Sequence, residues 1–304
     1  YILAINPSIL ADAGMDPTAV LLATCIASFI GIVYMALVGN LPFALSAGMG
    51  LNAYMAYTIV QNYGYTWQVA LFAVFIEGLI FIILSLTRVR EAIFNCIPSS
   101  LKVAISVGIG LFIAFIGLQN AGLVVSNNQT LVSILDFRYN FNTSGICALL
   151  AVVGTLMTTV LYLKKVKGSI LIGIIGTWVL GILCELTGLY LPNASMGFHS
   201  LLPNFQLTDF SKLGLTFGQC FHLDFKNVGF GNFITVIFAF LFVDIFDTVG
   251  TLIGLSSKAG MLDKEGKFPK AQPAMMAEAI ATTAGAILGT STMSTYVEAS
   301  SGIV

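Results

Sequence analysis

Residues 41–60 read LPFALSAGMGLNAYMAYTIV, an apolar stretch that is long enough to cross a bilayer but is interrupted in its first half. Gly48 and Gly50, together with a proline and a serine before them, weaken a helix there, whereas NAYMAY further on favours one. We therefore expect a broken span, with an extended part of small residues followed by a half-helix. In a membrane, such an interruption is tolerated only where it is buried in protein or lines a cavity.

The end of the chain has the same design. GTSTMSTYVEASSG, residues 289–302, begins with the small polar run TSTMST and turns helical at YVEASSG. Seven apolar segments precede the long segment at 232–257, so a second copy of the first seven would begin with inverted orientation. Inverted repeats with paired broken elements indicate a secondary transporter that binds its substrate near the bilayer midplane. We expect such repeats here, with 41–60 and 290–304 as the paired elements.

The composition indicates a membrane protein. Of 304 residues, 57% are hydrophobic and only 9% are charged, against about 25% in a soluble domain. The net charge of -1 leaves no basic field for a nucleic-acid backbone, so we do not expect nucleic acid as a partner. The five cysteines are scattered without metal-ligand spacing and there are two histidines, so we expect no metal and no other cofactor.

Apolar runs of membrane-spanning length recur along the whole chain. Besides 41–60, they cover 18–39, 67–87, 101–119, 143–163, 168–190, 232–257 and 273–289. A partial segment at each end brings the total to ten membrane elements, and we expect the chain to be cut within a membrane segment at both ends. The predicted fold class is therefore an all-α polytopic membrane protein with broken third and tenth elements.

The basic residues predict the orientation. Ten of the 13 lysines and arginines lie in three connections, 88–102, 164–167 and 258–270, and two spans separate each connection from the next. All three connections therefore fall on one side of the bilayer, which the positive-inside rule makes cytoplasmic. We expect the cell membrane as the location, with the long connections 120–142 and 191–230 on the outer side.

Acidic residues within spans mark candidate functional positions, because an ionisable group near the centre of a membrane helix costs about 2.5 to 3.5 kcal/mol. These residues are Glu77, Glu185, Asp244, Asp247, Glu278 and Glu298. Asp244 and Asp247 are three residues apart, hence on one helix face, where their repulsion favours a protonated state. The pair is the candidate acceptor of a coupling proton, with a purely structural pair as the alternative. Glu185 and Glu278 lie nearer span ends and can reach the interface.

The two broken elements supply further candidates. Glu298 follows the extended run of the tenth element, where the free N–H groups of a half-helix can hold a polar ligand. In the third element, Gly48 and Gly50 permit close approach of the backbone to a ligand, or else close helix packing. Asn52 offers an amide that both donates and accepts hydrogen bonds, and an amide in apolar surroundings needs partners.

The remaining candidates are weaker. Tyr54 and Tyr296 lie beside the two breaks and can stack on a ligand or hydrogen-bond to it. Glu77 is better explained as a hydrogen-bond clasp between helices, and Thr248, next to Asp247, as a structural contact.

Five segments together resemble one known family. They are YILAINPSILADAGMD (1–16), LPFALSAGMGLNAYMAYT (41–58), FVDIFDTVGTLIG (242–254), AGMLDKEGKFPKA (259–271) and GTSTMSTYVEASSG (289–302). They look like the nucleobase/cation symporters of the nucleobase–ascorbate transporter class, and in particular the adenine/guanine/hypoxanthine permease branch. The GMGLNA, VDxFDT and STYVEAS motifs are specific in this order, although Ala299 stands where the family pattern has Ser.

The resemblance implies a fold of fourteen segments in two inverted seven-segment repeats, divided into a core and a gate domain that move in an elevator-like cycle. It implies that 1–87 and 231–304 belong to the core, 88–190 to the gate and 191–230 to an outer linker. The activity that it implies is proton symport of a purine nucleobase across the lipid bilayer. Coupling to Na⁺ instead of H⁺ stays open, and a homodimer is a candidate assembly.

The resemblance also implies residue roles. Asp244 and Glu298 resemble the carboxylates that bind the purine, and Asp247 resembles a residue needed for transport and proton coupling. Gly50 and Asn52 resemble the third-element positions that shape the site. These roles agree with the chemistry of a purine, whose N–H donors match carboxylate acceptors.

Three alternatives stay open. An intramembrane aspartyl protease also uses two buried aspartates, but on separate helices and with a GxGD motif that this sequence lacks. A channel fits paired broken elements less well than alternating access does. A transporter of the same fold for uracil, xanthine or an inorganic anion is the nearest alternative, although Glu298 argues against an anion. We therefore expect a transporter and not an enzyme.

Overall fold

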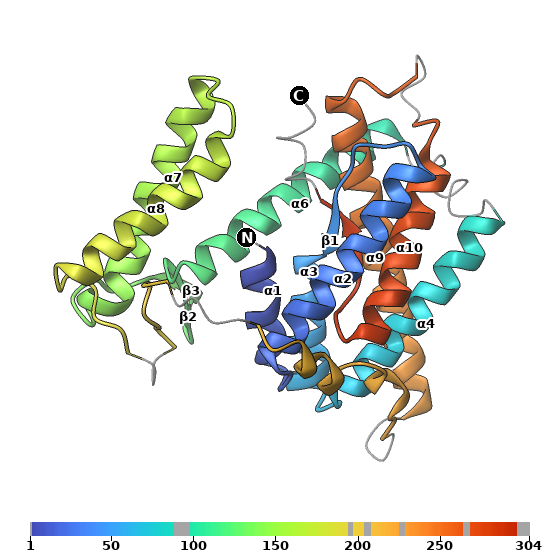
Figure 1. Ribbon diagram of the computed structural model, residues 1–304, viewed down its shortest axis with the longest axis horizontal. Helices are drawn as coiled ribbons and strands as arrows, with labels where there is room; N and C mark the ends of the chain where they lie inside the picture. The colour runs from blue at the N-terminus through green and yellow to red at the C-terminus, as the bar shows by residue number, and fades with distance from the viewer. Residues whose placement is uncertain are drawn as a thin grey trace. The chain divides into compact units, whose positions relative to one another are not determined.

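The computed structural model describes residues 2–87, 96, 98–193, 197–203, 208–224, 229–263 and 268–296 (Figure 1). The described chain is mostly helical. Within these described residues, five helices are long and apolar enough to cross a membrane, namely Pro17–Leu37, Trp67–Leu86, Phe141–Leu163, Ser169–Leu186 and Gly231–Lys258. These helices confirm the prediction of a helical multi-pass membrane protein.

The chain divides into two compact units, of which unit 1 comprises Tyr1–Gly110 with Thr208–Val304 and unit 2 comprises Leu111–Leu207. The elements of unit 1 are α1 (Ile2–Ala11), α2 (Pro17–Leu37), β1 (Leu45–Ala47), α3 (Met49–Ala53), the π-helical η1 (Tyr54–Asn62), α4 (Trp67–Leu86), the 3₁₀ turns η4 (Phe210–Leu215) and η5 (Gln219–Phe221), α9 (Phe230–Lys258), α10 (Ala271–Leu288) and β4 (Met293–Thr295). Helix α6 (Ser99–Asn120) begins in unit 1 and ends in unit 2. The remaining elements of unit 2 are β2 (Val124–Asn127), β3 (Leu131–Ile134), η2 (Phe141–Gly145), α7 (Ile146–Leu163) and α8 (Ser169–Leu186).

Helix α2 begins where the sequence provides an N-cap. The Asp16 carboxylate accepts from the backbone N–H groups of Thr18 and Ala19, both at 2.9 Å, and Pro17 occupies the first helical position. Both features favour a helix start, because the first N–H groups of a helix lack internal partners. Lys212 from η4 approaches the same carboxylate at 3.5 Å. The cap thus ties the start of the first long span to a connection far along the chain.

Helix α10 packs against both α2 and α4, and glycines allow the close approach (Figure 1). A Cβ added at Gly31 of α2 would lie 2.7 Å from the Cβ of Ala281. A Cβ added at Gly78 of α4 would lie 2.4 Å from Thr283 Oγ1 and 2.9 Å from the Thr283 backbone nitrogen. Small residues at contacts between membrane helices let the backbones pack closely, which is the main attraction between such helices in lipid.

The extended parts of the two broken elements pair with each other. Strands β1 and β4 are antiparallel, with Leu45 opposite Thr295 and Ala47 opposite Met293, and both strands are buried. The pairing continues beyond the strands, because the Gly48 N–H donates to the Thr292 carbonyl at 3.0 Å. Buried backbone groups must find partners inside the protein, and each extended stretch supplies them for the other.

Unit 2 is built around the hairpin of α7 and α8, which reciprocal glycine–threonine contacts hold together. A Cβ added at Gly154 of α7 would lie 2.2 Å from Thr177 Oγ1, and one added at Gly173 of α8 would lie 1.9 Å from Thr158 Oγ1. Neither glycine therefore tolerates a side chain without movement of the helices. Strands β2 and β3 form a second antiparallel pair in this unit.

The described elements agree with the broken spans expected at 41–60 and 290–304. The third element consists of β1 followed by α3 and η1, as its sequence predicts. The tenth element begins with β4, and its expected half-helix falls on residues 297–304, outside the described residues. The inverted repeats, the division into core and gate, and the expected truncation at both ends stay predictions.

Candidate functional site

The acidic pair on α9 lies beside the break in the third element. Asp244 is buried and Asp247 is half-buried, and the two residues lie three positions apart on the same face of α9. A Cβ added at Gly48 would lie 3.8 Å from Asp247 Oδ2 and 3.0 Å from Ser294 Oγ of β4. The structure therefore brings α9, the third element and the tenth element together at Gly48. A side chain at this position would fill the space between Asp247 and β4.

Two aromatic residues border this junction. The ring of Tyr54 meets that of Phe240 edge to face, with centroids 5.4 Å apart, and Phe240 lies one turn before Asp244 on α9. Tyr296 follows β4, and its hydroxyl lies 3.5 Å from the Ala47 carbonyl. Both tyrosines are half-buried. Their rings thus stand next to the two breaks, and their stacking on a ligand stays a prediction.

Both the donor and the acceptor atom of the Asn52 amide take part in a buried hydrogen-bond network. Its Nδ2 donates to Asn6 Oδ1 and its Oδ1 accepts from Ser291 Oγ. Asn6 in turn donates to Thr24 Oγ1 at 2.7 Å and to Thr290 Oγ1 at 3.0 Å. The five residues are all buried, so this network links α1, α2 and α3 to the start of the tenth element. In this conformation Asn52 braces the tenth element, and its predicted contact with a purine stays a prediction.

Glu77 also holds the extended run of the tenth element. Glu77 lies on α4, and its Oε2 accepts from Thr292 Oγ1 at 2.9 Å. Thr282 of α10 brackets the next residue, since its Oγ1 donates to the Met293 carbonyl at 3.1 Å and accepts from the Met293 N–H at 3.0 Å. The Glu77 hydrogen bond joins α4 to an extended run, whereas the clasp predicted for Glu77 is between two helices.

The position of Glu278 near a span end suggests that it reaches the membrane interface. In the structure it does not. The residue is only 1% exposed and accepts hydrogen bonds from two other elements. Its Oε2 accepts from Thr248 Oγ1 of α9 at 2.9 Å. Its Oε1 accepts from the backbone N–H of Thr295 at 2.9 Å and from the Thr295 hydroxyl. The expectation was wrong because α10 is flanked by other helices, so the carboxylate finds donors inside the protein instead of water.

The predicted site residues differ in what the structure says of them. Gly48, Asp244, Asp247, Thr248, Tyr54 and Tyr296 lie on the three elements that meet at the junction, and Gly50 is a half-buried residue of α3. Glu298 lies outside the described residues. Sequence reasoning missed Asn6. The signal that could have found it is the same as for Asn52, an amide within an apolar membrane segment.

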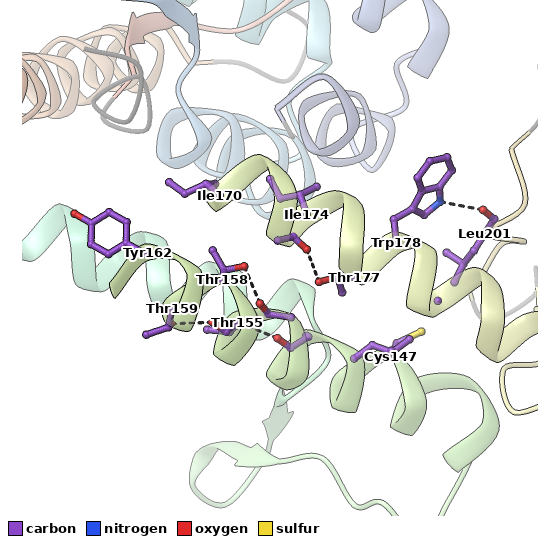
Figure 2. Close-up of a pocket in the computed structure, with 15 residues that line it drawn as sticks. Cys147, Thr155, Thr158, Thr159, Tyr162, Ile170, Ile174, Thr177, Trp178 and Leu201 are labelled. Carbon is purple, nitrogen blue, oxygen red and sulfur yellow. Dashed lines mark hydrogen bonds between the residues drawn. The ribbon is translucent and has the colours of Figure 1, made fainter. Parts of the chain in front are cut away.

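A groove of about 700 Å³ lies between α7 and α8 (Figure 2). Its lining is mostly apolar, and its threonine hydroxyls bond back to their own helices. Thr158 Oγ1 donates to the Gly154 carbonyl and Thr177 Oγ1 to the Gly173 carbonyl, both at 2.7 Å (Figure 2). These hydroxyls are therefore committed to the backbone, and the groove lacks the convergent polar groups that recognise a purine. Among the described residues, no group of three or more His, Cys, Asp or Glu could hold a metal ion.

Comparison with known proteins identifies relatives over the whole chain. A model described as the permease family matches residues 1–304. A permease of Methanocaldococcus jannaschii is 46% identical over 303 residues, covering 100% of this chain and 64% of the relative. The guanine/hypoxanthine permease PbuO of Bacillus subtilis is 41% identical (100% and 66%), and the adenine permease AdeP of Escherichia coli is 36% identical (100% and 63%). The chain thus spans 63% to 66% of the length of these relatives.

Proposed function

Because the chain belongs to the permease family, in the nucleobase–ascorbate transporter class, we propose that it is the greater part of a transporter for purine nucleobases. The observation that carries the proposal is the junction of Asp247, Gly48 and β4 in a chain whose relatives are named as adenine and guanine/hypoxanthine permeases. The family consists of permeases, so the chain is not an enzyme and the aspartyl protease is ruled out.

The chemistry of the junction suits a purine. Carboxylates on α9 accept hydrogen bonds from ring and exocyclic N–H groups, and the half-buried rings of Tyr54 and Tyr296 offer flat apolar surfaces. A site built to bond such donors rejects a ligand that lacks them, because its buried acceptors would then lose their partners. Glu298, predicted at the start of the adjacent half-helix, completes the proposed binding set with Asn52 and Gly50.

We propose proton coupling through the acidic pair. Asp244 and Asp247 lie on one face of α9, so a proton on one relieves the repulsion between them. A proton that enters with the purine would also reduce the negative charge of the site before it crosses the membrane, which lowers the cost of moving it. The proposed cycle is elevator-like alternating access in the cell membrane, with H⁺ as the coupling ion. Na⁺ coupling and a uracil, xanthine or anion substrate are the alternatives, and a homodimer is a candidate assembly.

An uptake assay tests this function. The complete gene product would be reconstituted into liposomes, and uptake of radiolabelled adenine and hypoxanthine would be measured with a pH gradient, with a Na⁺ gradient and with neither. We expect uptake driven by the pH gradient, with competition by purines and none by uracil or sulfate. Asp247→Asn should keep some purine binding but lose the dependence of uptake on the pH gradient. Uptake of uracil or sulfate in preference to purines would refute the assignment.

A further inference from the structure

Helix α10 carries a carboxylate that hydrogen-bonds to two elements next to the proposed purine site, α9 and β4. Glu278 accepts from Thr248 of α9 through one oxygen and from Thr295 of β4 through the other. All three residues are at most 1% exposed. The two oxygens of one planar group therefore join two elements that are about 50 residues apart in the sequence.

Each of the two donors adjoins a residue of the proposed site. Thr248 directly follows Asp247 and lies one turn after Asp244, on the stretch of α9 that carries the acidic pair. Thr295 is the last residue of β4 and directly precedes Tyr296. Strand β4 also contacts α9 and α10. The Glu278 carboxylate thus bridges the stretch of α9 that carries the acidic pair and the end of β4.

We propose that Glu278 is a positioning residue for the purine site: it holds the acidic pair of α9 and the end of β4 at the separation that the purine requires. The inference rests on the proposed function. Glu278 itself need not contact the substrate, because its oxygens bond to Thr248 and Thr295. Its effect on the substrate passes through the geometry of the groups on either side.

The chain contains a matched control for this role. Glu77 of α4 is as fully buried as Glu278 and bonds the same extended run, but through Thr292, which directly precedes β4 and lies three residues before Thr295. Both carboxylates therefore brace the tenth element. The contact with Thr248 beside the acidic pair distinguishes Glu278 from Glu77 in the proposal.

The test compares Glu278→Gln with Glu77→Gln in the complete gene product. Glutamine keeps the shape and one oxygen acceptor for Thr295. Toward the Thr248 hydroxyl it presents an uncharged amide, so the charge-assisted hydrogen bond is lost and only a neutral bond of reversed direction can replace it. Initial uptake rates would be measured for radiolabelled adenine and hypoxanthine, and the amount of transporter in the membrane would be quantified. We expect Glu278→Gln to raise the KM by about tenfold, a change typical of one lost charge-assisted hydrogen bond, and to alter the adenine-to-hypoxanthine KM ratio. Glu77→Gln should keep both KM values within about twofold.

A second variant tests the route of the effect. Thr248→Val removes the donor on α9, should raise the KM in the same way and remains informative if Glu278→Gln fails to accumulate. If the two residues act through one hydrogen bond, the double variant should be no worse than either single variant. Additive effects of Glu278→Gln and Thr248→Val in the double variant would overturn the proposal. It would also be overturned if both variants kept the KM for each purine within about twofold and changed the maximal rate only in proportion to the amount of protein.

Hydrogen–deuterium exchange gives a readout that does not depend on the substrate. Glu278→Gln should increase amide exchange in peptides covering 244–251 and 293–296 together, whereas Glu77→Gln should act on the peptide covering 290–293. Unchanged exchange at both sites of Glu278→Gln would also overturn the proposal. If the unmodified protein takes up no purine, the proposed function fails, and the exchange data still decide whether Glu278 couples α9 to β4.

Discussion

The contact between α4 and α10 gives the sharpest test of how unit 1 is held together. Gly78 of α4 faces Thr283 of α10, and we consider the substitution Gly78→Ala. The added Cβ would lie 2.4 Å from Thr283 Oγ1, 2.9 Å from its backbone nitrogen and 3.1 Å from its Cα. The hydroxyl can rotate away, but the backbone of a packed helix cannot. Ordinary van der Waals contact requires that the two helices separate by about half an ångström.

The magnitude follows from two opposing effects. Overpacking a well-filled contact typically costs about 1 to 3 kcal/mol. Replacing glycine by alanine in a helix interior gains about 1 kcal/mol, because alanine loses less backbone entropy. We therefore expect Gly78→Ala to destabilise unit 1 by up to about 2 kcal/mol, which corresponds to a fall of several degrees in the melting temperature.

Gly254→Ala provides the control. Gly254 lies in α9, and a Cβ added there would have nothing within 4 Å. This variant retains the gain in helix propensity without the clash. Melting temperatures would be measured in detergent, by heating followed by size-exclusion chromatography. We expect Gly254→Ala to be as stable as the unmodified protein or slightly more stable. A Gly78→Ala protein that melts at the temperature of the Gly254→Ala protein would refute the reasoning, because the clash would then be absent.

Two further predictions concern polar groups. Asn6→Ala should lower the melting temperature because it leaves the buried Asn52 Nδ2 donor without its acceptor, at a cost of about 1 to 3 kcal/mol; an unchanged melting temperature would contradict the network. At Asp16, the hydrogen bond from the Ala19 backbone, the charge of Lys212 and the hydrogen bond from the Thr18 backbone hold the pKa of the carboxyl below its usual value, partly opposed by burial. Its stabilisation of the folded state is therefore present above about pH 4 and is lost as the pH falls through the lowered pKa. Asp16→Ala should cost about 1 kcal/mol at pH 7, and the difference from the unmodified protein should shrink below pH 4 in melting curves taken across this range.

The sequence predicts the long spans well because the bilayer imposes both their length and their composition. The runs 18–39 and 67–87 correspond to α2 (Pro17–Leu37) and α4 (Trp67–Leu86), and α9 (Phe230–Lys258) extends the run 232–257 by a residue or two at each end. The broken third element is equally readable, since small residues and a proline interrupt its apolar run. These signals are local, so one sequence carries them in full.

The partners of these segments could not be predicted, because contact between distant elements leaves no local pattern. Strands β1 and β4 are three residues each and buried on both faces, so they lack the alternation that identifies a strand. Gly78 reads as a helix-weakening residue until Thr283 is seen against it. The position of Glu278 near a span end suggested water as its partner, whereas helix packing supplies hydroxyl and amide donors.

The cost of burying a polar group identifies both bracing residues and binding residues, and it cannot separate them. Asn52 illustrates the difficulty, because its amide is engaged with Asn6 and Ser291 and therefore supports the tenth element in this conformation. To distinguish a bracing residue from a binding residue, one must know which of its donors and acceptors already bond to other groups of the protein. By that criterion, an Asn52 variant should alter transport mainly through the position of Ser291 and the residues that follow it. If Asn52 itself contacts the substrate, its hydrogen bond to Asn6 must break first. In that case Asn6→Ala, which removes this bond, should change the affinity for purine as well as the stability.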